Sequence, residues 1–162
     1  MASNKGKQKG NKYERDVARK LSLWMFNDSE ALWRNSSSGA RGYKGDIVPY
    51  KPIPWKRWPF LVEVKAGYLR QMPKGLSYPN IVEEWLIKAC NQLGGQQEYV
   101  LLIIKFHRCR DVLITTKASL IKTRPYFIFL PNSSKVRGYV YDFATLLASP
   151  FHKTVNMRIL KI

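Results

Sequence analysis

The chain has 162 residues, of which 45% are hydrophobic and 13% aromatic, a composition typical of one globular domain and not of a disordered chain. Its 28 Lys and Arg side chains against 11 Asp and Glu give a net charge of +17. No stretch reaches the roughly 18 to 20 unbroken apolar residues of a membrane helix, the polar beginning does not resemble a secretory signal, and two cysteines do not indicate a disulfide framework. We therefore expect a cytoplasmic protein that attracts polyanions, with nucleic acid favoured over an anionic membrane.

The first part of the chain is predicted to contain a basic arm, a helix and three strands. Residues 1–10 are interpreted as a flexible basic arm that precedes a single domain over 11–162. Apolar residues at helical spacing predict a helix over 12–27. Strands are expected over 31–35, 46–50 and 60–66. A loop rich in Gly and Ser separates the first two strands, and a proline-rich connection precedes the third.

The remainder of the chain is predicted to continue an α/β pattern. A helix is expected over 81–93, with Gly94 and Gly95 at its end. The nearly continuous apolar run 99–106 is typical of a strand that is covered on both faces. Further strands are expected over 112–116, 126–130 and 138–142, with a short helix over 143–148. The order of helix, three strands, helix and strand predicts a mixed β-sheet flanked by helices.

The strand FLVEVKA carries two charged side chains in an otherwise apolar sequence. Side chains alternate along a strand, so Glu63 and Lys65 share one face with Leu61. Burying charged groups costs free energy unless they are paired or bind a metal. The motif alone fits an ordinary ion pair on a half-exposed strand as well as it fits a catalytic site.

Two further carboxylates favour the catalytic site over the ordinary ion pair. Asp46 follows Gly45 at the start of the preceding strand, and carboxylates on adjacent strands can supply the hard oxygen ligands that Mg²⁺ prefers. Glu14 lies beside the buried stripe of the first helix. Alternatively, Asp46 is a turn residue and Glu14 interacts with the helix dipole. With only 11 acids in the chain, we favour a joint site of Glu14, Asp46, Glu63 and Lys65.

These residues occur within the segments KGNKYER, RNSSSG, GDIV and LVEVK. In this order the segments resemble the archaeal-type Holliday junction resolvases, members of the PD-(D/E)xK nuclease superfamily that also occur in phages. The resemblance covers roughly residues 9–106. It implies a restriction-endonuclease-like fold and a magnesium-dependent endodeoxyribonuclease.

The resemblance also implies roles for individual residues. Glu14, Asp46, Glu63 and the backbone carbonyl of Val64 would bind Mg²⁺, for which Mn²⁺ would substitute. Lys65 would position or activate the attacking water and stabilise charge on the phosphate. Such chemistry requires a metal to polarise the phosphoryl oxygen, and a cation near the developing charge.

Other residues are candidates for binding DNA. The resemblance implies that Arg15 and Arg34 bind phosphates and that Ser38 lies close to the scissile group. Arg41 and Lys44 of the glycine-rich loop are candidates for contacts with the DNA backbone, although a solvated loop explains them equally well.

The resemblance favours a four-way junction as substrate. Resolving a junction requires two symmetric cuts, so one site per chain predicts a twofold homodimer. Its candidate surfaces are the second helix with Trp85 together with the C-terminal strands, or Trp55 and Trp58. Those two tryptophans are alternatively base-stacking residues or core residues. The rival functions are a repair nickase or restriction-type enzyme of the same superfamily, and a non-catalytic DNA-binding protein.

Overall fold

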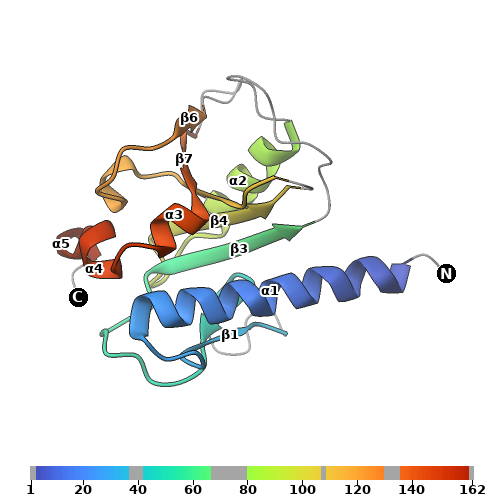
Figure 1. Cartoon of the computed structure of the whole chain (residues 1–162), viewed down its shortest axis with the longest axis horizontal. Helices are drawn as coiled ribbons and strands as arrows, with labels where there is room; N and C mark the ends of the chain where they lie inside the picture. Colours follow the sequence, from blue (N-terminus) through green and yellow to red (C-terminus); the bar gives the residue numbers. More distant parts are fainter. Residues whose placement is uncertain (1–2, 37–41, 67–79, 107–108, 130–135, 161–162) are drawn as a thin grey trace.

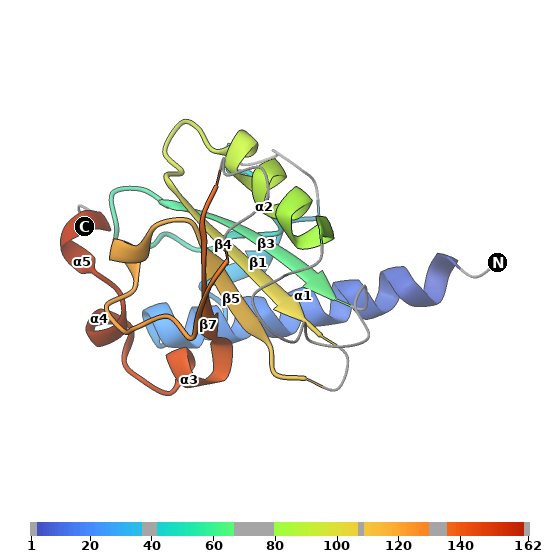
Figure 2. The same cartoon turned by 90° about the horizontal axis from the view of Figure 1, so that it is seen from above.

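The computed structural model describes residues 3–36, 42–66, 80–106, 109–129 and 136–160. Within these ranges the chain forms a seven-stranded sheet with helices on both faces (Figures 1 and 2). The helices are α1 (Ser3–Phe26), α2 (Asn80–Gln92), α3 (Phe143–Leu147), α4 (Phe151–Thr154) and α5 (Met157–Leu160), with a single 3-10 turn, η1 (Ala118–Leu120). The strands are β1 (Leu32–Arg34), β2 (Ile47–Pro49), β3 (Phe60–Ala66), β4 (Tyr99–Lys105), β5 (Val112–Thr115), β6 (Phe127–Phe129) and β7 (Gly138–Asp142).

The sheet is mixed, with the order β1-β2-β3-β4-β5-β7-β6. β3 and β4 are parallel and pair along their whole length, from Phe60 opposite Tyr99 to Ala66 opposite Lys105. α2 lies between these two strands in the chain, as the crossover between parallel strands requires. All other neighbouring strands are antiparallel. The predicted α/β fold with a mixed sheet is confirmed.

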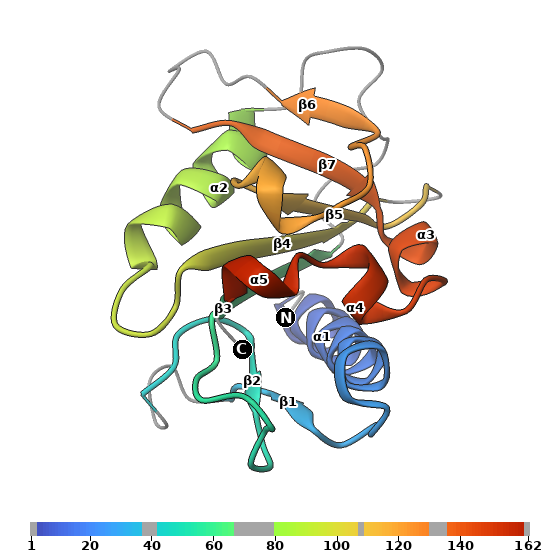
Figure 3. The ribbon, with the colours of Figure 1, turned by 90° about the vertical axis from the view of Figure 1, so that its left-hand side faces the viewer.

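Two apolar clusters cover the two faces of the sheet. On one face, α1 packs through Tyr13, Val17 and Leu21, which recur at helical spacing, and α3, α4 and α5 join the same cluster (Figure 3). On the other face, α2 packs through Val82, Leu86 and Ala89. β3 alternates between them, with Phe60, Val62 and Val64 in the α1 cluster and Leu61 in the α2 cluster. This alternation is the one expected from the sequence.

The structure corrects the sequence prediction at both ends of the chain. Residues 3–10, which the sequence assigned to a flexible arm, belong to α1, so this helix begins well before residue 12. After residue 148 the chain forms α4 and α5, which were not expected. None of the helices in the described part of the chain is long and apolar enough to cross a membrane.

Candidate active site

The backbone of Asp46 is fixed where β2 meets β3. Its N–H donates a hydrogen bond to the carbonyl of Val62 at 2.7 Å, and its own carbonyl accepts one from Asn35 at 2.7 Å. Gly45 has a φ of +100°, and a Cβ at this position would lie 2.7 Å from the Val62 carbonyl oxygen. Only glycine can therefore precede Asp46 without displacing it from β3.

The carboxylate of Asp46 contacts the backbone of β3. Its Oδ2 accepts a hydrogen bond from the backbone N–H of Val64 at 2.8 Å. The pKa of Asp46 is raised to about 6, mainly by burial and also by the charges of Glu63 and Glu14, while the Val64 N–H and Lys65 act in the opposite direction. Asp46 therefore lies in a site with excess negative charge, which a bound cation would compensate.

Glu63 and Lys65 contact each other on β3. The Nζ of Lys65 donates to the Oε2 of Glu63 at 3.0 Å, and the two side chains are only 24% and 16% exposed, respectively. The shared face predicted from the strand is thus observed, and an ion pair forms on it. Asp46 contacts the strand between these two residues, through the N–H of Val64, and both charges act on its pKa.

Glu14 reaches this region from α1 and is bound by Arg34 of β1. The Nε of Arg34 donates to the Glu14 carboxylate, and its Nη2 donates to the Oδ1 of Asn11 at 2.9 Å. Arg34, which was expected to bind phosphate, therefore links β1 to α1. Glu14 acts on Asp46 through its charge, which is the weakest of the influences on that pKa.

Two of the other DNA-binding candidates are described by the structure, and both are exposed. Arg15 is exposed on α1, one residue after Glu14. Lys44 is exposed, and its Nζ donates to the carbonyl of Gln92 at the end of α2, at 3.2 Å. Ser38 and Arg41 lie outside the described residues.

Gln97 positions the segment before Asp46, and the sequence did not reveal it. Its side chain is buried, its Oε1 accepts from the N–H of Lys44 at 2.8 Å, and its Nε2 donates to the carbonyls of Lys44 and Phe60. A buried amide that is fully hydrogen-bonded fixes its neighbours in place. A glutamine just after the Gly94-Gly95 turn carries no signal for this contact, because its partner is 53 residues away.

The residues present fit a divalent cation in part. Asp46 and Glu63 offer carboxylate oxygens, the ligands that Mg²⁺ prefers. In the described part of the chain, however, no three Asp, Glu, His or Cys side chains are grouped closely enough to bind a metal together. Glu14 is engaged by Arg34, so a third carboxylate would become available only if this pair rearranged.

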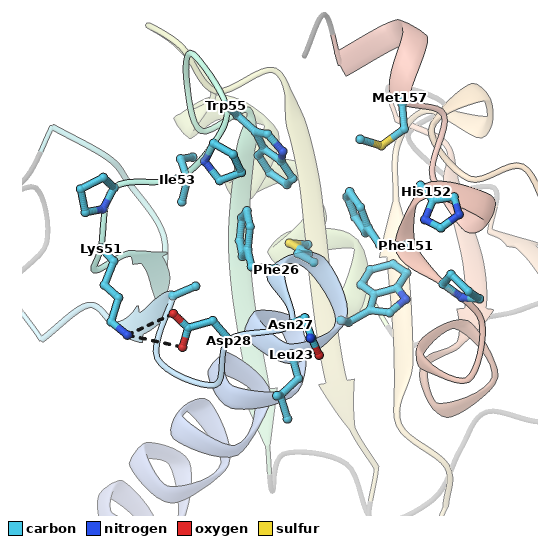
Figure 4. Close-up of a pocket in the computed structure, with 16 residues that line it drawn as sticks. Leu23, Phe26, Asn27, Asp28, Lys51, Ile53, Trp55, Phe151, His152 and Met157 are labelled. Carbon is cyan, nitrogen blue, oxygen red and sulfur yellow. Dashed lines mark hydrogen bonds and ion pairs between the residues drawn. The ribbon is translucent and has the colours of Figure 1, made fainter.

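Of the two tryptophans in the proline-rich connection, Trp58 is a core residue and Trp55 is partly buried against the core. Trp58 is completely buried, and Trp55 stacks on it with ring centroids 6.0 Å apart and an interplanar angle of 8°. The structure therefore overturns base stacking by Trp58 and supports the packing alternative. Trp55 also lines a cavity of about 680 Å³ with Phe26 and Phe151 at the C-terminal end of α1 (Figure 4). The residues that line this cavity include none of the four candidate active-site residues.

Comparison with known proteins assigns the chain to a family. Residues 5–147 match a family model described as "Phage putative PDDEXK endonuclease". No curated protein and no solved structure shows a significant match to the chain. The matched region contains all four candidate active-site residues and all seven strands of the sheet. The chain belongs to this phage family of PD-(D/E)xK endonucleases.

Proposed function

We propose that the protein is a metal-dependent, structure-selective DNA endonuclease that resolves four-way junctions by paired phosphodiester cleavage. The observation that carries this proposal is the grouping of Asp46, Glu63 and Lys65 where β2 meets β3. Two carboxylates and an ammonium within one partly buried site are the side chains that phosphodiester hydrolysis with a divalent cation requires. The charge of +17 supports a polyanionic substrate.

In this proposal Asp46 and Glu63 bind Mg²⁺, or Mn²⁺ in its place, with Glu14 and the Val64 carbonyl as further ligands. The metal supplies polarisation of the phosphoryl oxygen and a lowered pKa of a bound water. Lys65, already adjacent to Glu63, places an ammonium near the phosphate where negative charge develops. A fixed cation at that position stabilises the transition state more than the ground state, and this difference raises the rate.

Binding of the DNA backbone is assigned to cations around the site. Arg15 and Lys44 are exposed, and Arg34 would bind phosphate if it exchanged its contact with Glu14 for one with DNA. Arg41 and Ser38 complete the proposed set. Each phosphate that these residues neutralise releases a condensed counterion, so affinity should decrease steeply with salt.

Paired cuts on opposing strands require two active sites, and one chain carries one. We therefore propose a twofold homodimer formed by α2 and the C-terminal strands. Tyr126 and Ile128 are exposed at β6, which is the outer strand of the sheet. Exposed aromatic and aliphatic side chains at an edge of this kind favour an interface.

The decisive experiment compares a mobile four-way junction with flap, bubble and linear duplex substrates, with and without Mg²⁺. Paired cutting of the junction that requires the metal is expected. A cruciform plasmid distinguishes linear product from nicked circles, while light scattering gives the oligomeric state. A monomer that yields mainly nicked circles would exclude junction resolution and favour a repair nickase, and preferential cutting of linear duplex would favour a restriction-type enzyme.

A further inference from the structure

An exposed pair of aromatic side chains lies at the β1 edge of the sheet. Trp33 of β1 is 52% exposed and Tyr50, directly after β2, is 51% exposed. Their ring centroids are 5.2 Å apart with an interplanar angle of 35°, so the two rings form one continuous aromatic surface. Such a surface in water is costly to maintain and commonly marks a binding site.

This aromatic pair lies on the same face of the sheet as Asp46, Glu63 and Lys65. Trp33 is opposite Val48, and Tyr50 is two residues beyond Val48 on the same side. Asp46 precedes Val48 by two residues, so it also belongs to this face. Ile47 faces the α1 cluster instead. The same alternation on β3 places Glu63 and Lys65 on the face of Leu61, opposite α1.

The aromatic pair is also close to the site along the chain. Trp33 is adjacent to Arg34, which binds Glu14. Tyr50 is separated from Asp46 by four residue steps, about 13 Å along a strand. The cluster beneath α2 includes residues of β3, β4, β5 and β7, and none of its described members comes from β1 or β2.

We propose that Trp33 and Tyr50 form a stacking platform for an unpaired base of the DNA substrate, next to the phosphate that is cut. Aromatic side chains bind single-stranded DNA by stacking on bases of any sequence, and such bases are present at branch points and absent from an intact duplex. The platform would thus select branched DNA, and this inference rests on the proposed function.

DNA fits this surface better than a second copy of the chain. The proposed homodimer uses α2 and the C-terminal strands, which leaves the β1 edge for another partner, and the charge of +17 attracts a polyanion. β1 has only three residues, so its edge offers few backbone groups to another strand.

The test measures binding in EDTA, so that it does not depend on cleavage. Fluorescence anisotropy compares a labelled single strand with a blunt duplex of the same length for the wild type, Trp33→Ala, Tyr50→Ala and Trp33→Phe. We expect Trp33→Ala to weaken binding of the single strand at least about fivefold and to leave the duplex unchanged, with Trp33→Phe close to wild type. Leu23→Ala removes an apolar side chain that is 46% exposed on α1, and serves as the control.

A second readout reports stacking directly. A single strand with 2-aminopurine should lose fluorescence when the wild type binds and retain it with Trp33→Ala, whose fold is checked by thermal unfolding. Equal losses on single strand and duplex, or unchanged quenching, would overturn the platform. Dissociation of an oligomer by Trp33→Ala, seen by light scattering, would identify the pair as a contact between copies instead.

Failure of the platform and failure of the proposed function give different results. If the wild type does not cut junctions but binds single strands through Trp33, the platform stands and junction resolution is wrong. If junction cutting is efficient and insensitive to Trp33→Ala and Tyr50→Ala, the endonuclease stands and the platform is wrong.

Discussion

The guanidinium of Arg34 donates a hydrogen bond to the carboxylate of Glu14, and this pair joins β1 to α1. Both side chains are largely buried, with exposed fractions of 23% and 18%, so removing one would leave the charge of the other without its partner. The pair therefore stabilises the fold and also holds one of the proposed metal ligands.

Removing Arg34 should destabilise the protein through the carboxylate that it leaves behind. We expect Arg34→Ala to lower the free energy of unfolding by about 1 to 3 kcal/mol, as measured by urea denaturation. Adding Glu14→Gln should restore part of this loss. The exposed pair of Lys20 and Asp16 is the control, and Lys20→Ala should cost less than about 1 kcal/mol. Strictly additive effects of Arg34→Ala and Glu14→Gln would show that the pair does not act as a unit.

Asp46→Asn should remove cleavage and stabilise the metal-free protein. Asparagine retains an oxygen that can accept the Val64 hydrogen bond, but it has no charge to bind a metal or to repel Glu63. Single-turnover cleavage should decrease about 10²-fold or more. Thermal unfolding in EDTA at pH 7 should show a higher melting temperature than wild type. Asp16→Asn is the surface control, and a variant that cuts at the wild-type rate would contradict the metal site.

The raised pKa of Asp46 predicts that metal binding weakens in acid. Because Asp46 has a pKa of about 6 and not the ordinary 3.8, it must release a proton to bind a cation below pH 6. Calorimetric titration with Mn²⁺ should show affinity decreasing up to about tenfold for each pH unit below 6. The metal-free protein should also lose stability as the pH rises from about 4 to 6, since the folded state binds this proton more tightly than the unfolded state. An affinity that does not change between pH 5 and 7 would exclude Asp46 as a ligand.

Lys65→Ala should slow the chemical step much more than it weakens DNA binding. The proposed role of the ammonium is exerted in the transition state, and only interactions that strengthen there raise the catalytic rate. Single-turnover kinetics at saturating enzyme separates the two effects, and Lys20→Ala is a control on an exposed face. If only the affinity decreased, Lys65 would be a phosphate-binding residue.

Gly45→Ala should impair both the fold and the site. The Cβ would lie 2.7 Å from the carbonyl oxygen of Val62, and the φ of +100° is strained for any other residue. The added methyl group must therefore displace Asp46 from β3. We expect a loss of melting temperature with a decrease in cleavage, whereas Gly94→Ala, where a Cβ meets nothing within 4 Å, should change little. Wild-type stability in Gly45→Ala would show that this turn adapts readily.

The two central strands, β3 and β4, could be predicted because their hydrophobic sequence patterns are strong. The alternation of FLVEVKA and the apolar run over 99–106 placed β3 and β4 within one residue of their observed bounds. The same alternation correctly placed Glu63 and Lys65 on one face. Position along a strand is a local property, so the sequence alone contains it.

What could not be predicted depends on contacts between distant segments. Residues 3–10 contain Gly6 and Gly10, which disfavour a helix, and so α1 was expected to begin later. The pairing of Arg34 with Glu14 and the contact of Gln97 with Lys44 arise only when the sheet and helices assemble. Likewise the sequence does not indicate whether an aromatic side chain is exposed. Trp58 is buried, whereas Trp33 is 52% exposed.

The length of α1 has a geometric consequence for any polyanion that approaches the site. A helix of 24 residues extends about 36 Å, and among its described side chains the first buried one is Tyr13. The first turns of α1 project beyond the sheet (Figure 1). Lys9 and Lys12 are exposed on this projection. A cation on a flexible tail averages over many positions, whereas one on a helix keeps a constant offset from Glu14. The positive charges on the projecting part of α1 therefore influence the direction in which a duplex arm of DNA leaves the protein. They also influence how strongly that arm is bound.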